Sequence, residues 1–271
     1  MQRIKQILGA DLRQYTMVLA LAALIIVFNI ISDGRMLTSS NFQNLLSGNA
    51  YVLVLALGML MVIVIGQIDL SVGSVAGFAG MVMAKAAHDL NMPWYVAVLV
   101  ALVIGALAGA WNGFFLAKLG IPGFITTLGS MMMFRGAVIW ISISISVPAP
   151  DELRFFGAGY LPEWGPAFTG MNNSTLLLGL IGIIVFIVFE MKKYRQSASL
   201  SGDRAPLWTV IVRIAIISAV IGYFTWLYGS GRVGTSFPIP GVILLILVIL
   251  YHIITQKTMF GRHVYAVGGN K

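Results

Sequence analysis

The chain has 271 residues, of which 59% are hydrophobic and 10% charged, and its formal net charge is +8. A soluble domain usually has about a quarter of its residues charged, so this chain has too little polar surface for a water-soluble fold. The absence of cysteine excludes disulfides and thiolate metal sites. The three histidines are too scattered to suggest a metal site, and we expect no cofactor.

Continuous apolar runs recur along the chain, and several are long enough to cross a membrane as helices. A hydrocarbon layer of roughly 30 Å needs about 20 apolar residues at 1.5 Å each. We therefore predict an all-α, polytopic transmembrane bundle of about eight spans, forming a single domain over 1–271. The expected spans lie near 15–31, 49–65, 73–88, 94–116, 122–146, 174–190, 207–228 and 238–256.

Basic side chains are distributed unevenly between the connections, which predicts the orientation. With a cytoplasmic N-terminus, only Arg35, Arg154 and Arg232 face outward. Eleven basic residues then face the cytoplasm: Arg3, Lys5, Arg13, Lys118, Lys192, Lys193, Arg195, Arg204, Lys257, Arg262 and Lys271. Cytoplasmic loops carry an excess of Lys and Arg, so the N-terminus is predicted to be cytoplasmic. This topology also accounts for the basic excess without nucleic-acid binding.

Two polar connections separate the expected spans. The outer one, at about 147–173, contains VPAPDELRFFGAGYLPEWGP, which predicts either an ordered cap that binds an external partner or a plain loop. The cytoplasmic one, 191–206, reads MKKYRQSASLSGDRAP. Its basic residues either determine topology or contact a cytoplasmic partner or anionic lipid.

The stretch GQIDLSVG at 66–73 separates two apolar runs with almost no loop. A tight helix corner needs glycine, and Asp69 or Ser71 could cap the following helix. The third span would rise only about 24 Å, so the break could lie partly within the bilayer. A carboxylate facing lipid costs at least roughly 2.5–3.5 kcal/mol, which would turn Asp69 inward. Gln67, Asp69 and Ser71 are therefore candidates for a helix cap, a translocation path or both.

Other polar residues extend this candidate site. Asn112 lies near the cytoplasmic end of the fourth span and Arg135 near the middle of the fifth. An intramembrane arginine suggests a functional site, although it could also pair with a carboxylate or carbonyl, or snorkel. We expect Asp69 and Arg135 to face one another or a shared polar cavity. Lys85 and Arg213, nearer span ends, are predicted to snorkel.

Small residues form two stripes that predict close packing between helices. They are Gly73, Gly77, Gly80, Ala84 and Ala87 in the third span, and Gly105, Gly109 and Gly113 in the fourth. No catalytic motif accompanies them: GxSxG, HExxH and the phosphate-binding P-loop are all missing. The chain is therefore not expected to be an enzyme or to hydrolyse ATP.

Three motifs together resemble the permease subunits of bacterial ABC importers for monosaccharides, the ribose, galactose and xylose group. They read GQIDLSVGSVAG, AGAWNGFFLAKLGIPGFITTLGSMMMFRG and FGRHVYAVGGNK. The resemblance covers roughly 40–145 and 174–271. Related branched-chain amino-acid permeases differ at IDLSVG, which favours a sugar. A basic linker and an extra span pair near 191–237 resemble an insertion in xylose-type and multiple-sugar permeases.

The resemblance implies a homodimeric pair of permeases around a central path in the bacterial inner membrane. A separate ATPase subunit would act from the cytoplasm, and a periplasmic binding protein would deliver the monosaccharide. The segment that docks on the ATPase would begin with Gly261, Arg262, Tyr265, Gly268, Gly269 and Asn270. The family continues beyond this point, whereas the sequence ends at Lys271, so we expect a fragment or a truncated product.

Two other hypotheses remain from the sequence. A secondary, ion-coupled transporter or channel would be expected to carry buried acids in several spans or repeated halves. Asp69 is the only convincing intramembrane acid, and no repeat is visible. A non-transporting remnant is the other alternative. Which sugar is carried does not follow from such apolar spans.

Overall fold

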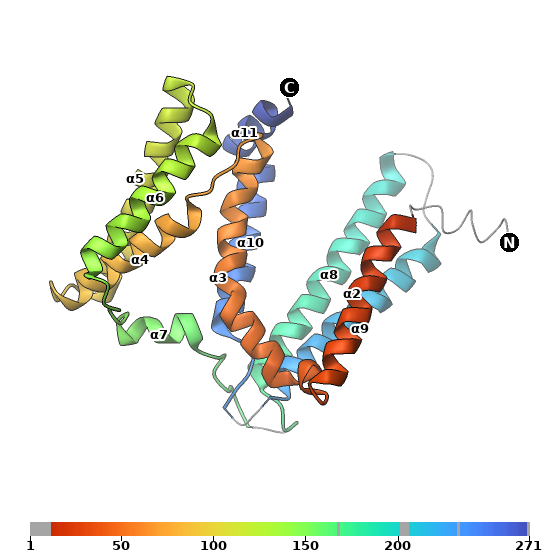
Figure 1. Ribbon diagram of the computed structural model, residues 1–271. Helices are drawn as coiled ribbons and strands as arrows, with labels where there is room; N and C mark the ends of the chain where they lie inside the picture. Colours follow the sequence, from red (N-terminus) through yellow and green to blue (C-terminus); the bar gives the residue numbers. More distant parts are fainter. Residues whose placement is uncertain (1–11, 167–168, 201–205, 232–233, 270–271) are drawn as a thin grey trace. The chain divides into compact units, whose positions relative to one another are not determined.

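The structure, a computed structural model, describes residues 12–166, 169–200, 206–231 and 234–269 (Figure 1). Over these ranges it is helical and contains no strand, apart from an isolated antiparallel bridge between Tyr160 and Pro238. The all-α prediction is confirmed. The chain forms two compact units: Met1–Leu45 with Leu161–Phe237 (unit 1) and Leu46–Tyr160 with Pro238–Lys271 (unit 2), as far as they are described.

Unit 1 contains α2 (Leu12–Ile31), the 3₁₀ turn η1 (Arg35–Leu37), the start of α3 (Ser39–Val64), α8 (Asn173–Leu200) and α9 (Leu207–Gly229). Helices α8 and α9 pack closely at Gly179. A Cβ at this position would run into the Thr225 side chain, so the close approach needs a glycine. The start of α3 is tied to the end of α9, since Gln43, only 1% exposed, donates a hydrogen bond of 2.9 Å to the Tyr228 carbonyl.

Unit 2 contains the rest of α3, α4 (Val72–His88), α5 (Trp94–Leu119), α6 (Gly123–Ser142), α7 (Asp151–Ala158), α10 (Ile239–Lys257) and α11 (Met259–Gly269). Helix α4 packs on both α5 and α6. Phe78 meets Phe134 of α6 with ring centroids 5.3 Å apart. The connection at 147–173 holds α7, and the Ile239 amide at the start of α10 donates to the Gly159 carbonyl at 2.9 Å.

Each of the eight expected apolar segments is helical, and six described helices reach the length of a full span. These six are Ser39–Val64, Trp94–Leu119, Gly123–Ser142, Asn173–Gln196, Leu207–Gly229 and Ile239–Lys257. Helix α4 has 17 residues and the apolar part of α2 begins at Thr16, so both are shorter. Helix α8 continues to Leu200, so the polar linker expected from residue 191 begins inside a helix.

The glycine stripes do not pack as predicted. A Cβ on any glycine of either stripe, Gly77 and Gly109 included, would meet no atom within 4 Å in the described structure. Of the stripe on α4 only Ala84 is buried, together with Ala86 beside it, and α5 buries Ala97 and Ala108. Spacing identifies a face of small residues, but it does not say whether a helix of the same chain lies opposite.

Candidate functional site

The candidate site begins where α3 ends. Gly66 has φ 78°, a left-handed conformation that glycine adopts without steric cost. Its N–H donates to the Ile63 carbonyl at 2.9 Å, and the Gln67 N–H donates to Val62 at 3.1 Å. A left-handed glycine at a helix end lets backbone N–H groups bond the last carbonyls of the helix, which would otherwise be unpaired. Residues 67–71 are then non-helical until α4 begins at Val72.

The non-helical segment 67–71 contacts one face of α6. Gln67 lies against Gly123, where an added Cβ would come within 2.6 Å of Gln67 Oε1. Further along, the Thr127 hydroxyl accepts the Leu70 N–H at 3.1 Å and lies 3.3 Å from the Ile68 carbonyl, to which it can donate. Gly123 and Thr127 are both buried on α6, one helical turn apart. Helix α6 thus supplies hydrogen-bond partners for backbone groups of segment 67–71, which lies outside any helix.

Four side chains in and beside the break form one chain of hydrogen bonds. Ser130 of α6 donates to Asn112 Oδ1 at 2.5 Å, and Asn112 Nδ2 of α5 donates to Ser71 Oγ at 2.9 Å. The Ser71 hydroxyl and N–H both donate to Asp69 Oδ1, at 2.6 and 2.7 Å. All donors point toward the carboxylate, so each bond polarises the next. Ser71 is 0% exposed and Ser130 4%, whereas Asp69 is half-buried.

The break extends from the turn that joins α5 to α6, where Gln67 lies against Gly123, to the Asn112–Ser130 contact deeper along the two helices. Asn112 precedes the end of α5 at Leu119 by seven residues, and Ser130 follows the start of α6 at Gly123 by seven. At 1.5 Å per residue, the Asn112–Ser130 contact is about 10 Å from that turn along both helices. Non-helical backbone at such a depth survives in a membrane only where protein or a watery cavity surrounds it. The polar contacts from α5 and α6 provide that surrounding.

The predicted site residues divide into two groups. Gln67, Asp69, Ser71 and Asn112 all contribute to the break, and Asp69 rather than Ser71 accepts the N–H at the start of α4, because Ser71 makes no side-chain cap bond. Arg135 is exposed and forms no ion pair with Asp69 or any other described acid. No ion pair therefore joins Asp69 and Arg135, and a shared polar cavity for the two residues stays a prediction.

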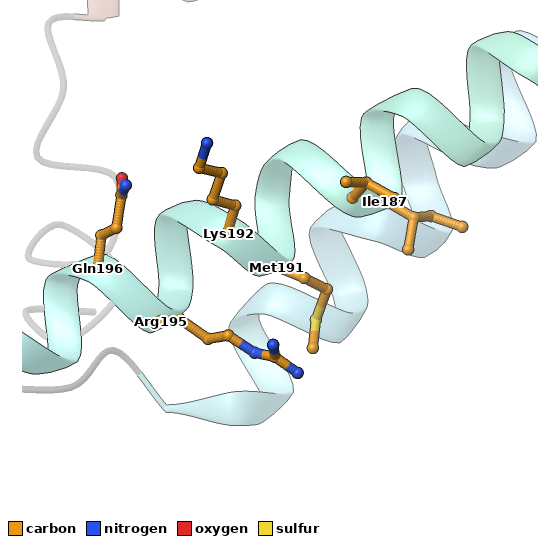
Figure 2. Close-up of a pocket in the computed structure, with 6 residues that line it drawn as sticks. Ile187, Met191, Lys192, Arg195 and Gln196 are labelled. Atoms are coloured by element: carbon orange, nitrogen blue, oxygen red, sulfur yellow. The ribbon is translucent and has the colours of Figure 1, made fainter.

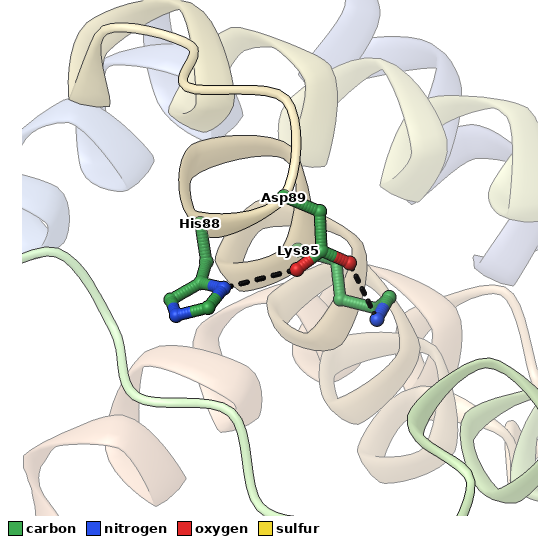
Figure 3. A network of polar contacts seen from close by, with 3 residues as sticks. All are labelled: Lys85, His88 and Asp89. Carbon is green, nitrogen blue, oxygen red and sulfur yellow. Dashed lines mark hydrogen bonds and ion pairs between the residues drawn. The ribbon is translucent and has the colours of Figure 1, made fainter.

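Two ion pairs involve the residues that were expected to snorkel. Lys85 Nζ lies 2.6 Å from Asp89 Oδ2 just beyond α4, and His88 Nδ1 lies 3.0 Å from the other oxygen (Figure 3). Hydrogen bonds from Lys85 and then His88 lower the pKa of the Asp89 carboxyl below its usual value. Arg213 of α9 lies 2.6 Å from Glu190 of α8, whose side chain is 7% exposed. Sequence reasoning missed Glu190 because it falls at the end of an apolar run.

The expected ATPase-coupling segment forms α11, which contacts α3 within unit 2. A Cβ on Gly268 would run into the Val64 carbonyl oxygen, at the last residue of α3. Gly261 is buried at the corner with α10, where a Cβ would run into the Thr255 carbonyl. Arg262, Tyr265 and Gly269 are exposed, and Asn270 lies outside the described residues. The segment therefore touches the chain two residues before Gly66.

Six apolar helices of span length among the described residues, one of which (α3) is followed by a polar break, define a multi-pass membrane protein. Residues 41–271 match the family described as branched-chain amino acid transport system / permease component, and the chain belongs to this family. It is a family of transport permeases and not of enzymes, as expected.

The relatives include permease proteins of xylose and D-allose transport systems. The chain is 34% identical over 262 residues to the xylose transport system permease protein XylH of Escherichia coli strain K12, covering 96% of this chain and 63% of that protein. XylH of Haemophilus influenzae is 31% identical, over 97% of this chain and 67% of its own length. The D-allose transport system permease protein AlsC of Escherichia coli strain K12 is 26% identical, over 82% and 69%. No solved structure matches the chain.

Proposed function

We propose that the chain is part of the permease subunit of an ABC importer that carries a monosaccharide across the bacterial inner membrane. Its energy would come from a separate ATPase subunit, and a periplasmic binding protein would deliver the sugar. Family membership and the similarity to permease proteins of xylose and D-allose transport systems support this proposal. The chain spans 63% of the length of the XylH of Escherichia coli that it matches, so the activity is proposed for the whole protein.

The observation that carries the proposal is the polar break between α3 and α4. Discontinuous membrane helices form substrate sites in many transporters, because their freed polar groups can bind a ligand inside the bilayer. Asp69 uses one oxygen, Oδ1, in the described hydrogen bonds and keeps Oδ2 available. A sugar offers hydroxyl groups that would donate to such an oxygen and accept from the amides of Gln67 and Asn112. We propose these residues, with Ser71 and Arg135, as lining of the path.

The proposal includes a cytoplasmic N-terminus. Within unit 2, the end of α3 meets α11 and the break contacts α5 and α6 near their connecting turn. The opposite ends of α4 and α10 adjoin the connection that holds α7. The end of unit 2 that holds α11 and the α5–α6 turn carries the basic residues Lys118, Lys257 and Arg262. This basic charge supports assigning that end to the cytoplasm.

A second copy of the permease completes the proposed transporter. The open glycine face of α4, with Gly73, Gly77 and Gly80, has room for a helix of another chain. The extra span pair near 191–237 would be an insertion within a single permease domain. Light scattering of the purified protein in nanodiscs tests the copy number, and a monomeric mass would contradict the pair.

The test is uptake of labelled sugars by the permease in proteoliposomes, with and without its ATPase and loaded binding protein. We expect uptake of xylose or another monosaccharide only when both partners and ATP are present. Uptake without an ATPase would refute the proposal and favour an ion-coupled carrier. No uptake of any sugar with every component present would favour the non-transporting alternative.

A further inference from the structure

A hollow of about 500 Å³ opens on one side of α8, near the end of its membrane-spanning part. It is lined by Ile187, Val188, Met191, Lys192, Arg195 and Gln196 (Figure 2). The first three lining residues are apolar, the next two cationic, and none is acidic. Apolar and positive surface therefore follow one another along the helix within about two and a half turns.

The helical spacing puts these residues on one continuous strip. Ile187, Met191 and Arg195 recur every four residues, and Figure 2 shows Met191 and Arg195 extending from the same side of α8. Val188 and Lys192 follow the same spacing on the neighbouring row. The packed face of α8 is a different one, because Glu190 is directed to Arg213 of α9.

The two cations have no ion-pair partner among the described residues. Neither Lys192 nor Arg195 forms an ion pair with a described acid, and Glu190 is already occupied by Arg213. The membrane-spanning part of α8 ends at Gln196, so both cations lie at the depth of lipid headgroups. Met191 and Ile187 lie one and two turns deeper, where acyl chains begin.

We propose that this hollow binds an anionic phospholipid. The headgroup phosphate would pair with Lys192 and Arg195, and the upper part of one acyl chain would lie along Ile187, Val188 and Met191. Charge complementarity commits the site to an anionic lipid, since a zwitterionic choline headgroup would bring a positive charge to the same cations. The apolar half of the strip distinguishes a lipid from a free phosphate ion, which would gain nothing there.

The test is photo-crosslinking of the reconstituted protein with a photoactivatable phosphatidylglycerol, mapped by mass spectrometry. We expect labelling around Ile187–Met191, at a half-saturating lipid fraction roughly thirtyfold higher in the variant Lys192→Gln/Arg195→Gln, at about 1 kcal/mol for each of the two basic residues. Lys193→Gln removes one positive charge from a neighbouring residue that does not line the hollow, and should leave labelling unchanged. The swap Lys192→Arg/Arg195→Lys should retain it.

Several outcomes would overturn the proposal. Equal loss of labelling in Lys193→Gln would show a general surface-charge effect. Competition by phosphatidylcholine as strong as by unlabelled phosphatidylglycerol would exclude selection for anionic lipid. Full competition by soluble glycerol phosphate would indicate an anion site without a lipid-binding part. If the variant Lys192→Gln/Arg195→Gln aggregates, the swapped pair and Met191→Gln take its place. Met191→Gln removes only the apolar contact and should also weaken labelling.

Discussion

Asn112 Nδ2 on α5 donates a hydrogen bond of 2.9 Å to Ser71 Oγ, the residue at which the polar break ends and α4 begins. The two residues are 41 positions apart in the sequence. This contact therefore ties the start of one membrane helix to a position seven residues from the end of another. With the contacts of Gln67 and Leu70 on α6, it fixes the break to the rest of unit 2.

Replacing Asn112 by Leu should weaken both the fold and transport. The change removes the donor to Ser71 Oγ, and it leaves the buried Ser130 hydroxyl without Asn112 as its acceptor, at a cost of about 1–3 kcal/mol for that hydroxyl. Thermal unfolding in detergent should shift to lower temperature, and sugar uptake should fall. Asn112→Asp keeps the size and an acceptor for Ser130 but loses the donor to Ser71. An uptake rate equal to wild type in both variants would contradict a role for Asn112 in the path.

Neighbouring threonines on α6 provide a matched test of the break. Thr127 accepts the Leu70 N–H at 3.1 Å, whereas the buried hydroxyl of Thr126 has no hydrogen-bond partner in the structure. Thr127→Val should destabilise the protein by about 1–3 kcal/mol because it leaves that N–H unsatisfied. Thr126→Val has the same shape change and should be neutral or stabilising. Equal unfolding temperatures for the two variants would show that segment 67–71 does not depend on α6.

The sequence was sufficient to locate the break but not its supports. Gly66, Asp69 and Ser71 are conspicuous because helix-breaking and charged residues are costly among apolar ones. Thr127 and Ser130 were not singled out, since hydroxyl side chains are tolerated in membrane helices by bonding to their own backbone. Their role depends on which face of α6 meets the break, and this is a tertiary contact. The apolar segments themselves could be predicted because the bilayer fixes their length and composition.

The charged pair on α8 and α9 was beyond sequence reasoning for a related reason. An acid at the end of an apolar run and an arginine 23 residues later can each reach water separately, and only the hairpin brings them together. For the glycine stripes the sequence predicted a contact that the described structure does not contain. Their spacing indicated close packing, but helix neighbours within a chain depend on loops and on all the other faces.

Removal of Arg213 should destabilise the α8–α9 hairpin. Arg213→Gln leaves the Glu190 carboxylate, 7% exposed, without its 2.6 Å partner. The expected cost is about 1–3 kcal/mol, since a buried acceptor loses its charged donor. The double variant Glu190→Gln/Arg213→Gln should recover much of that loss, because no buried charge remains. A double-mutant cycle from thermal unfolding checks this, and strict additivity of the two single changes would contradict a direct interaction.

Cysteine labelling tests the proposed orientation. The chain contains no cysteine, so only the introduced cysteine can react. Ala149, next to α7, and Ala266, on α11, are both exposed and carry small side chains. Ala149→Cys should react with a membrane-impermeant maleimide added to intact spheroplasts. Ala266→Cys should react only after the membrane is opened. Labelling of Ala266→Cys from outside would reverse the topology.

Adjacent glycines on α11 test whether this helix passes motion to the polar break. A Cβ on Gly268 would run into the Val64 carbonyl, whereas a Cβ on Gly269 meets nothing within 4 Å. Gly268→Ala should push α11 away from the end of α3, two residues before Gly66. We expect the assembled transporter to lose sugar-stimulated ATP hydrolysis while the permease still binds its ATPase. Gly269→Ala makes the same change one residue along and should leave stimulation intact. Equal stimulation in the two variants would mean that the contact with Val64 has no part in coupling.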